Sequence, residues 1–111
     1  DGTVVNASSP ALTDYLNFSS LLTARDNSRQ SMADILAFRL SLNAIIDTTG
    51  LVDLDLSKVH FISHSLGSIT GTGALAIANE TLGAELAAFD SMYAFSNAAL
   101  NVPAGEYRRL F

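Results

Sequence analysis

A serine lies at the centre of the stretch whose residue types could do chemistry. Residues 59–73 read Val-His-Phe-Ile-Ser-His-Ser-Leu-Gly-Ser-Ile-Thr-Gly-Thr-Gly. The apolar run 59–62 is typical of a buried strand, and small and apolar residues at helical spacing follow the turn. A sharp strand-to-helix turn lifts a serine hydroxyl out of a sheet and places it at the positive end of a helix. We therefore predict that Ser65 is a catalytic nucleophile.

The neighbours of Ser65 fit such a turn. The backbone N–H of Leu66 is the natural first donor to an oxyanion that develops beside the serine. A strained turn needs small residues two before and two after the serine. Gly67 meets this need, whereas Ser63 stands where the usual pattern has glycine. His64 is an elbow-shaping residue, and we do not assign it as the general base, because its side chain is directed away from the serine hydroxyl.

The segment Ser63-His64-Ser65-Leu66-Gly67 resembles the Gly-His-Ser-Leu-Gly elbow of α/β-hydrolase lipases. Residues 17–30, Asn-Phe-Ser-Ser-Leu-Leu-Thr-Ala-Arg-Asp-Asn-Ser-Arg-Gln, resemble the segment that leads toward the elbow in bacterial extracellular lipases of the virulence-factor type. The resemblance spans roughly residues 17–105. It implies a secreted or cell-surface bacterial serine hydrolase that acts on a lipid or another carboxylic ester and needs no cofactor.

The rest of a catalytic triad is not evident in this chain. In the family that it resembles, the order along the chain is serine, acid, histidine. Both histidines, His60 and His64, precede Ser65, and Asp90 is the only aspartate after it. We therefore expect residues 1–111 to be one segment of a longer hydrolase domain, inactive alone. The triad acid, the histidine and the second oxyanion donor are expected elsewhere in the parent protein.

Composition narrows the class of protein. The 111 residues are 49% hydrophobic and only 15% charged, which suits one small core of buried parallel strands with covering helices. The net charge of −5 and six scattered basic residues disfavour nucleic acid as a partner. There is no cysteine, hence no disulfide and no thiolate metal site, and no apolar run reaches transmembrane length.

The pattern predicts a partial α/β-hydrolase fold with an incomplete parallel sheet. Helices are expected at 27–47, 66–79 and 84–93, and strands at 59–62 and 95–102. A short edge strand at 3–5 and a further helix from residue 106 are also expected. Asn27 and Gln30 match a capping box, while Gly50 and Gly83 fit helix ends. Open sheet edges should cause the isolated chain to self-associate.

Other interpretations remain open. Gly67-Ser-Ile-Thr-Gly71-Thr-Gly73 resembles the nicotinamide-cofactor loop of short-chain dehydrogenases, with Glu85 placed to hold a ribose. A non-catalytic module that keeps the hydrolase fold is a third possibility.

Simpler interpretations suit the remaining polar groups. Arg25 and Asp26 are more simply a cap with local ion pairs than a brace for an active site. Asp53 and Asp55 fit a solvated loop better than a carboxylate pair. His60 and His64 would lie about 13 Å apart on a strand, too far to share a metal ion.

Overall fold

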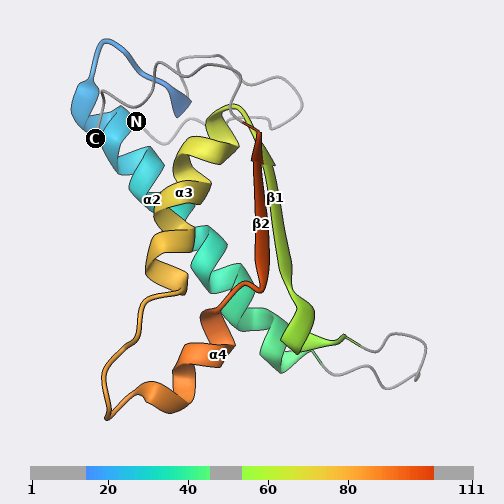
Figure 1. Cartoon of the computed structure of the whole chain (residues 1–111). Helices are drawn as coiled ribbons and strands as arrows, with labels where there is room; N and C mark the ends of the chain where they lie inside the picture. The colour runs from blue at the N-terminus through green and yellow to red at the C-terminus, as the bar shows by residue number, and fades with distance from the viewer. Residues whose placement is uncertain (1–14, 46–53, 102–111) are drawn as a thin grey trace.

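The computed structural model describes residues 15–45 and 54–101, which form a mixed α/β arrangement around a two-strand parallel sheet (Figure 1). The elements in chain order are helix α2 (Leu21–Ser41), the 3₁₀ turns η1 (Leu42–Ala44) and η2 (Leu56–Lys58), strand β1 (His60–His64), helix α3 (Leu66–Ala78), the 3₁₀ turn η3 (Ala87–Phe89), helix α4 (Asp90–Tyr93) and strand β2 (Asn97–Asn101). The coarse α/β class predicted from the sequence is therefore confirmed.

The sheet is formed by one strand–helix–strand unit. β1 pairs with β2 in parallel, in a register that runs from His60 opposite Asn97 to His64 opposite Asn101. Parallel strands need a crossover, and α3 with α4 supplies it. Both predicted strands and their parallel direction are confirmed, but their bounds shift: β1 starts at His60 and runs on to His64, and β2 starts at Asn97 rather than at residue 95. Val102 lies outside the described residues.

α3 matches the predicted elbow helix closely. The sequence predicts that Ile69, Gly73, Ala76 and Ile77 share a face, and that the small residues Gly71, Gly73, Ala74, Ala76 and Ala78 let the helix pack closely on the sheet. Close packing is confirmed at Gly71, Ala74 and Ala78, which are buried. In the structure the buried residues are the small ones and a leucine: Ser68, Thr70, Gly71, Ala74, Leu75 and Ala78. Ile77 is 53% exposed. The helix therefore packs through its smallest residues because these allow backbones to approach closely.

Two glycines show how close that approach is. A Cβ at Gly71 would lie 2.5 and 2.8 Å from ring atoms of Phe61 on β1. A Cβ at Gly73 would lie 2.8 Å from the end of Met32 on α2. Glycine costs a helix up to about 1 kcal/mol relative to alanine, so close packing on both sides accounts for these two positions.

α2 begins earlier than predicted. Its N-cap is Ser20, whose hydroxyl accepts a hydrogen bond from the Thr23 N–H at 3.4 Å. The predicted capping box was wrong: Asn27 lies inside the helix, and its Nδ2 donates to the Tyr15 carbonyl at 2.9 Å. The helix ends at Ser41, not at residue 47. Serine is a strong N-cap, and Ser20 just before the helix is the sequence signal for this earlier start.

The polar run at the start of α2 forms surface ion pairs. Asp26 lies 2.8 Å from the Arg25 guanidinium and 4.0 Å from that of Arg29, and all three side chains are more than half exposed. The simpler interpretation, local ion pairs, is confirmed. Exposed pairs of this kind contribute only about 0–1 kcal/mol.

A buried arginine ties α2 to the rest of the fold. Arg39 is 1% exposed, and burial lowers the pKa of its guanidinium. Its Nε donates to the Ala94 carbonyl at 2.9 Å and its Nη2 to the Ser91 carbonyl at 3.0 Å, while Nη1 has no hydrogen-bond partner among the residues that the structure describes. The guanidinium lies 5.9 Å from the Phe95 ring centroid, and Phe95 meets Phe61 edge to face at 5.5 Å. A continuous stack thus joins α2 to β1 beneath α3.

The connections differ in detail from the predictions. Asp55 caps η2, accepts hydrogen bonds from Ser57 and pairs with Lys58 at 3.1 Å, so the loop interpretation holds at this residue.

Gly83 has φ 88° but lies five residues beyond the end of α3, whose C-cap is Asn79, so its predicted role as a helix cap was wrong. The predicted helix 84–93 is the shorter pair η3 and α4. The predictions for residues 3–5, Gly50, Asp53 and 106–111 fall outside the described residues.

The helices do not cover the whole sheet. Side chains alternate along β1: Phe61 and Ser63 are half-buried, whereas His60, Ile62 and His64 are exposed. Ile62 is 81% exposed. In the described ranges no helix is long and apolar enough to cross a membrane.

Candidate active site at the β1–α3 turn

Ser65 sits at the point where β1 becomes α3, and its backbone is unusual. It is the N-cap residue of α3, with φ 52° and ψ −123°, and its side chain is exposed. Among the described residues it is the only non-glycine with positive φ. Such a conformation costs about 1–3 kcal/mol and persists only where the surroundings hold it. The expected sharp turn with an outward serine is therefore present.

The end of β2 holds this turn in place. The Ser65 N–H donates to the Asn101 carbonyl at 2.9 Å, and the Ser65 carbonyl accepts from the Ser68 N–H at 2.8 Å. The first bond crosses from the turn to the neighbouring strand, and the second closes the first turn of the helix. Both backbone groups of Ser65 are thus fixed, while its hydroxyl has no hydrogen-bond partner in the described part of the chain.

Ser63 is accommodated where the lipase pattern has glycine. It points from β1 toward α3, where a Cβ built on Gly67 would lie 3.7 Å from the Ser63 Cβ, an ordinary contact. The Ser63 and Ser68 hydroxyl oxygens lie 3.1 Å apart, and Ser68 Oγ donates to the Asn101 carbonyl at 3.1 Å. The extra side chain is therefore hydrogen-bonded rather than crowded.

The backbone N–H of Leu66 lies where an oxyanion donor is expected. Leu66 is the first residue of α3 and follows Ser65 directly. The first N–H groups of a helix have no acceptor within the helix, and the positive end of the helix dipole lies beside them. An anion that forms next to the Ser65 hydroxyl would meet this N–H.

The two histidines lie apart on the exposed side of β1. His60 begins the strand, and its Nδ1 lies 3.3 Å from Nδ2 of Asn97. His64 ends the strand beside Ser65 and is exposed. Across the described ranges no group of three or more histidine, cysteine or acidic side chains could hold a metal ion. Asp90 lies beyond the other end of α3, where its carboxylate accepts from the Leu82 N–H at 3.0 Å.

The glycine-rich stretch that suggested a nicotinamide loop is helical. Gly67, Gly71 and Gly73 all lie within α3, and the last two face Phe61 and Met32. A phosphate-binding loop needs its glycines in the turn before the helix. Here they lie after the turn, and Glu85 is exposed in the segment before η3.

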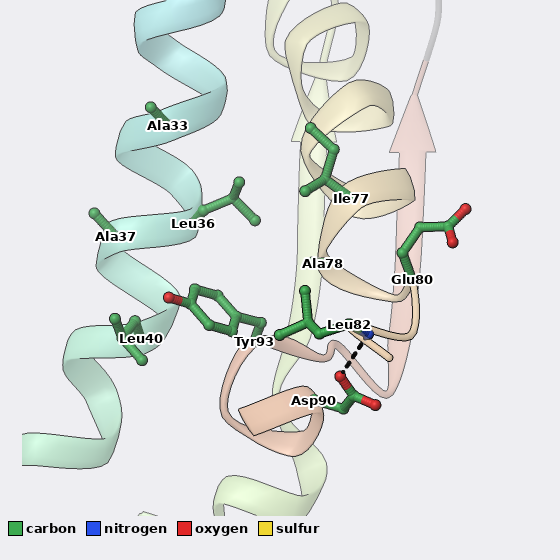
Figure 2. A pocket seen from close by; sticks show the side chains of 10 residues that line it. All are labelled: Ala33, Leu36, Ala37, Leu40, Ile77, Ala78, Glu80, Leu82, Asp90 and Tyr93. Carbon is green, nitrogen blue, oxygen red and sulfur yellow. Dashed lines mark hydrogen bonds between the residues drawn. The ribbon is translucent and has the colours of Figure 1, made fainter. Parts of the chain in front are cut away.

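An apolar pocket of about 470 Å³ lies at the far end of α3 (Figure 2). Leu36 and Leu40 of α2 and Ile77 of α3 line it, and the Tyr93 ring closes it from the side of α4. α3 has 13 residues, so at 1.5 Å per residue this pocket is about 20 Å from Ser65. It is therefore separate from the serine turn.

Comparison of the chain with known protein families, with curated proteins and with solved structures found no match.

The structure brings together four of the residues singled out in the sequence and adds two that were missed. Ser63, Ser65, Leu66 and Gly67 meet at the turn, with His64 on the opposite side of the strand. The missed groups are the Ser68 hydroxyl and the Asn101 carbonyl. Ser68 resembles any small helix residue in the sequence, and a backbone carbonyl leaves no residue-type signal.

Proposed function

We propose that the chain carries the nucleophile of a serine carboxylic ester hydrolase, a lipase or esterase, with Ser65 as the attacking residue. The single observation that supports it most strongly is the backbone of Ser65: φ 52° in an exposed serine between a strand and a helix. Strained residues cluster at functional sites, where the surroundings hold them in place.

The geometry suits covalent catalysis. The Ser65 Oγ attacks the ester carbonyl carbon while its proton passes to a base, and the carbonyl oxygen becomes an oxyanion beside the Leu66 N–H. The alcohol then leaves with a proton from that base, giving an acyl-serine that water hydrolyses to the acid and free serine. In this proposal the base and its acid partner belong to other segments of the parent domain, as the residue order predicts.

The finer identity is also part of the proposal. A parallel β1–α3–β2 unit with Ser65 at the turn fits the central part of an α/β-hydrolase domain of the bacterial extracellular lipase type. The substrate is then a lipid or another carboxylic ester, and the protein works outside the cell or on its surface. The exposed side of the sheet is where the rest of such a domain would pack.

A fluorophosphonate probe tests the nucleophile directly. It should label the longest natural form of the protein, and peptide mapping should place the adduct on Ser65. Ser65→Ala should abolish the label and lower the hydrolysis of a p-nitrophenyl ester by at least about a thousandfold. Ser91→Ala, which removes another exposed serine, should change neither. Labelling that persists in Ser65→Ala would contradict the proposal.

One observation keeps a non-catalytic role in view. In the described residues the Ser65 hydroxyl has neither a hydrogen-bonded base nor any other partner. If the folded natural protein neither reacts with the probe nor hydrolyses esters of short or long acids, the hydrolase fold without activity becomes the better account.

A further inference from the structure

We propose that Ser63 and Ser68 are positioning residues that clamp the Ser65 turn onto the end of β2 through the Asn101 carbonyl; their catalytic role rests on the function proposed above. Ser63, which stands where the lipase pattern has glycine, then helps to position Ser65. Two donors, the Ser65 N–H and the Ser68 hydroxyl, converge on the Asn101 carbonyl oxygen, and the Ser63 hydroxyl bonds to Ser68.

The direction of the hydrogen bonds follows from counting protons. A serine hydroxyl has one proton and two lone pairs. Ser68 gives its proton to the Asn101 carbonyl at 3.1 Å. Ser63, 3.1 Å from Ser68, must therefore donate to Ser68 Oγ rather than accept from it. The chain of donors runs from Ser63 to Ser68 to Asn101.

The Asn101 carbonyl is saturated by this arrangement. A carbonyl oxygen has two lone pairs, and here one accepts the Ser65 N–H at 2.9 Å and the other the Ser68 hydroxyl. Ser68 is fully buried, so neither water nor another group can replace it without a rearrangement. The strained residue and the first turn of α3 thus share one acceptor on the neighbouring strand.

A second buried hydroxyl in α3 shows what is distinctive about Ser68. Thr70 is 4% exposed, but its hydroxyl bonds only to the Leu66 and Gly67 carbonyls of its own helix, both at 3.4 Å. Among the described residues, the Thr70 hydroxyl makes no hydrogen bond to β2. Ser68 is the buried hydroxyl that links the helix to the strand, and Thr70 provides a matched control.

Amide hydrogen exchange at Ser65, measured by NMR on the folded protein, tests the clamp without any need for activity. Ser68→Ala should raise the exchange rate of the Ser65 N–H about tenfold, since a lost hydrogen bond of this kind is worth roughly 1 kcal/mol or more of local opening. Ser63→Ala should raise it about threefold, and Ser63→Thr, which keeps the hydroxyl, should restore it. The double variant should exchange no faster than Ser68→Ala, because both changes break one connected chain.

Thr70→Val should leave Ser65 exchange unchanged, and the Ala74 amide, one turn further along α3, should keep its rate in every variant. An unchanged Ser65 rate in Ser63→Ala and in folded Ser68→Ala would overturn the clamp. So would an equal rise in Thr70→Val. If Ser68→Ala does not fold, Ser63→Ala and Ser63→Thr decide the question, since Ser63 is only half-buried.

Fluorophosphonate labelling separates this proposal from the function that it rests on. The clamp predicts that Ser68→Ala lowers the maximal labelling rate of Ser65 about tenfold and leaves the probe concentration for half-maximal rate unchanged. If the unaltered protein is not labelled at all, the hydrolase proposal fails, while the exchange experiment still decides the clamp.

Discussion

The two faces of β1 differ in what covers them. On one face Phe61 and Ser63 meet α3 so closely that glycine is required opposite the Phe61 ring. On the other face His60, Ile62 and His64 are exposed, with Ile62 at 81%. The Ser65 turn is supported entirely from the covered face and the end of β2. The contrast teaches that a defined local site can exist beside a sheet face that is still unpacked.

The largest expected effect is on the stack behind the covered face. Arg39→Ala removes two short hydrogen bonds to the Ala94 and Ser91 carbonyls and the contact with Phe95. We expect it to lower the free energy of unfolding by about 3 kcal/mol, measured by urea denaturation. Arg29→Ala, an exposed control on the same helix, should cost less than about 0.5 kcal/mol. Equal losses in the two variants would show that the stack is not what holds α2.

The next effect is at the helix–sheet contact. Gly71→Val should lower the free energy of unfolding by about 2 kcal/mol, because its Cβ would displace the Phe61 ring, which Phe95 holds edge to face. Gly67→Ala is the matched control, since its Cβ meets Ser63 only at 3.7 Å. It should cost nothing measurable in the same denaturation experiment. A tolerated valine at position 71 would mean that the covered face is loosely packed.

A smaller effect, of opposite sign, is expected at the turn itself. Ser65→Gly should raise the free energy of unfolding by about 1 kcal/mol, because glycine adopts φ 52° without strain. Ser65→Ala keeps the Cβ and should bring no such gain. Thermal unfolding of the two variants measures the difference in their stability. Equal stabilities would show that the backbone of Ser65 is not strained.

The exposed face should influence association more than stability. Ile62→Thr should change the free energy of unfolding by less than about 0.5 kcal/mol and shift the chain toward monomer in sedimentation velocity. Ile77→Thr, which removes another exposed isoleucine away from the sheet, should leave the oligomer distribution unchanged. A wild-type chain that is already monomeric at high concentration would contradict the predicted self-association.

The smallest effect is a pH dependence at Asp55, the N-cap residue of η2. Hydrogen bonds from the Ser57 side chain, together with Lys58 and the Ser57 backbone, lower the pKa of Asp55 below its ordinary value of 3.8. The folded state therefore gains stability while the carboxylate is ionised, and loses it as the pH falls through the lowered pKa. NMR titration of the carboxyl carbon should show the lowered pKa, and Asp55→Asn should flatten this small acid-side loss. If Asp55→Asn loses as much stability at low pH as the wild-type chain, other groups cause that loss.

The sequence predicted the order of the strand, turn and helix well, but it predicted poorly which side chains pack against one another. The strand, turn and helix around Ser65 were predictable because apolar runs, small residues and turn position all agree at that point. The close packing of the small α3 residues was also predicted, but the side chains that they meet, Phe61 at Gly71 and Met32 at Gly73, were not, because residue type alone does not identify the partner. The start of α2 was missed because Asn27 and Gln30 match a capping-box spacing, whereas the N-cap of the helix is Ser20.

The same contrast holds for the candidate site: the residues of the motif were predictable, but their partners from other elements were not. Ser65, Leu66 and Gly67 were predictable from type and spacing, since the chemistry of a serine nucleophile needs those residues in that order. The Asn101 carbonyl was not, because it is separated from Ser65 by α3 and α4 and acts through the backbone. Ser63 was noted as a departure from the pattern, and only its distance to Ser68 shows what its hydroxyl does.

The hydrogen bond from Ser65 to Asn101 has a consequence for biosynthesis. The carbonyl that fixes the turn is translated only after the whole α3–α4 crossover. A growing chain on the ribosome therefore presents Ser65 without its acceptor until β2 has emerged and paired with β1. The Ser65 turn is therefore held in place only after the whole β1–α3–β2 unit has been synthesised and paired.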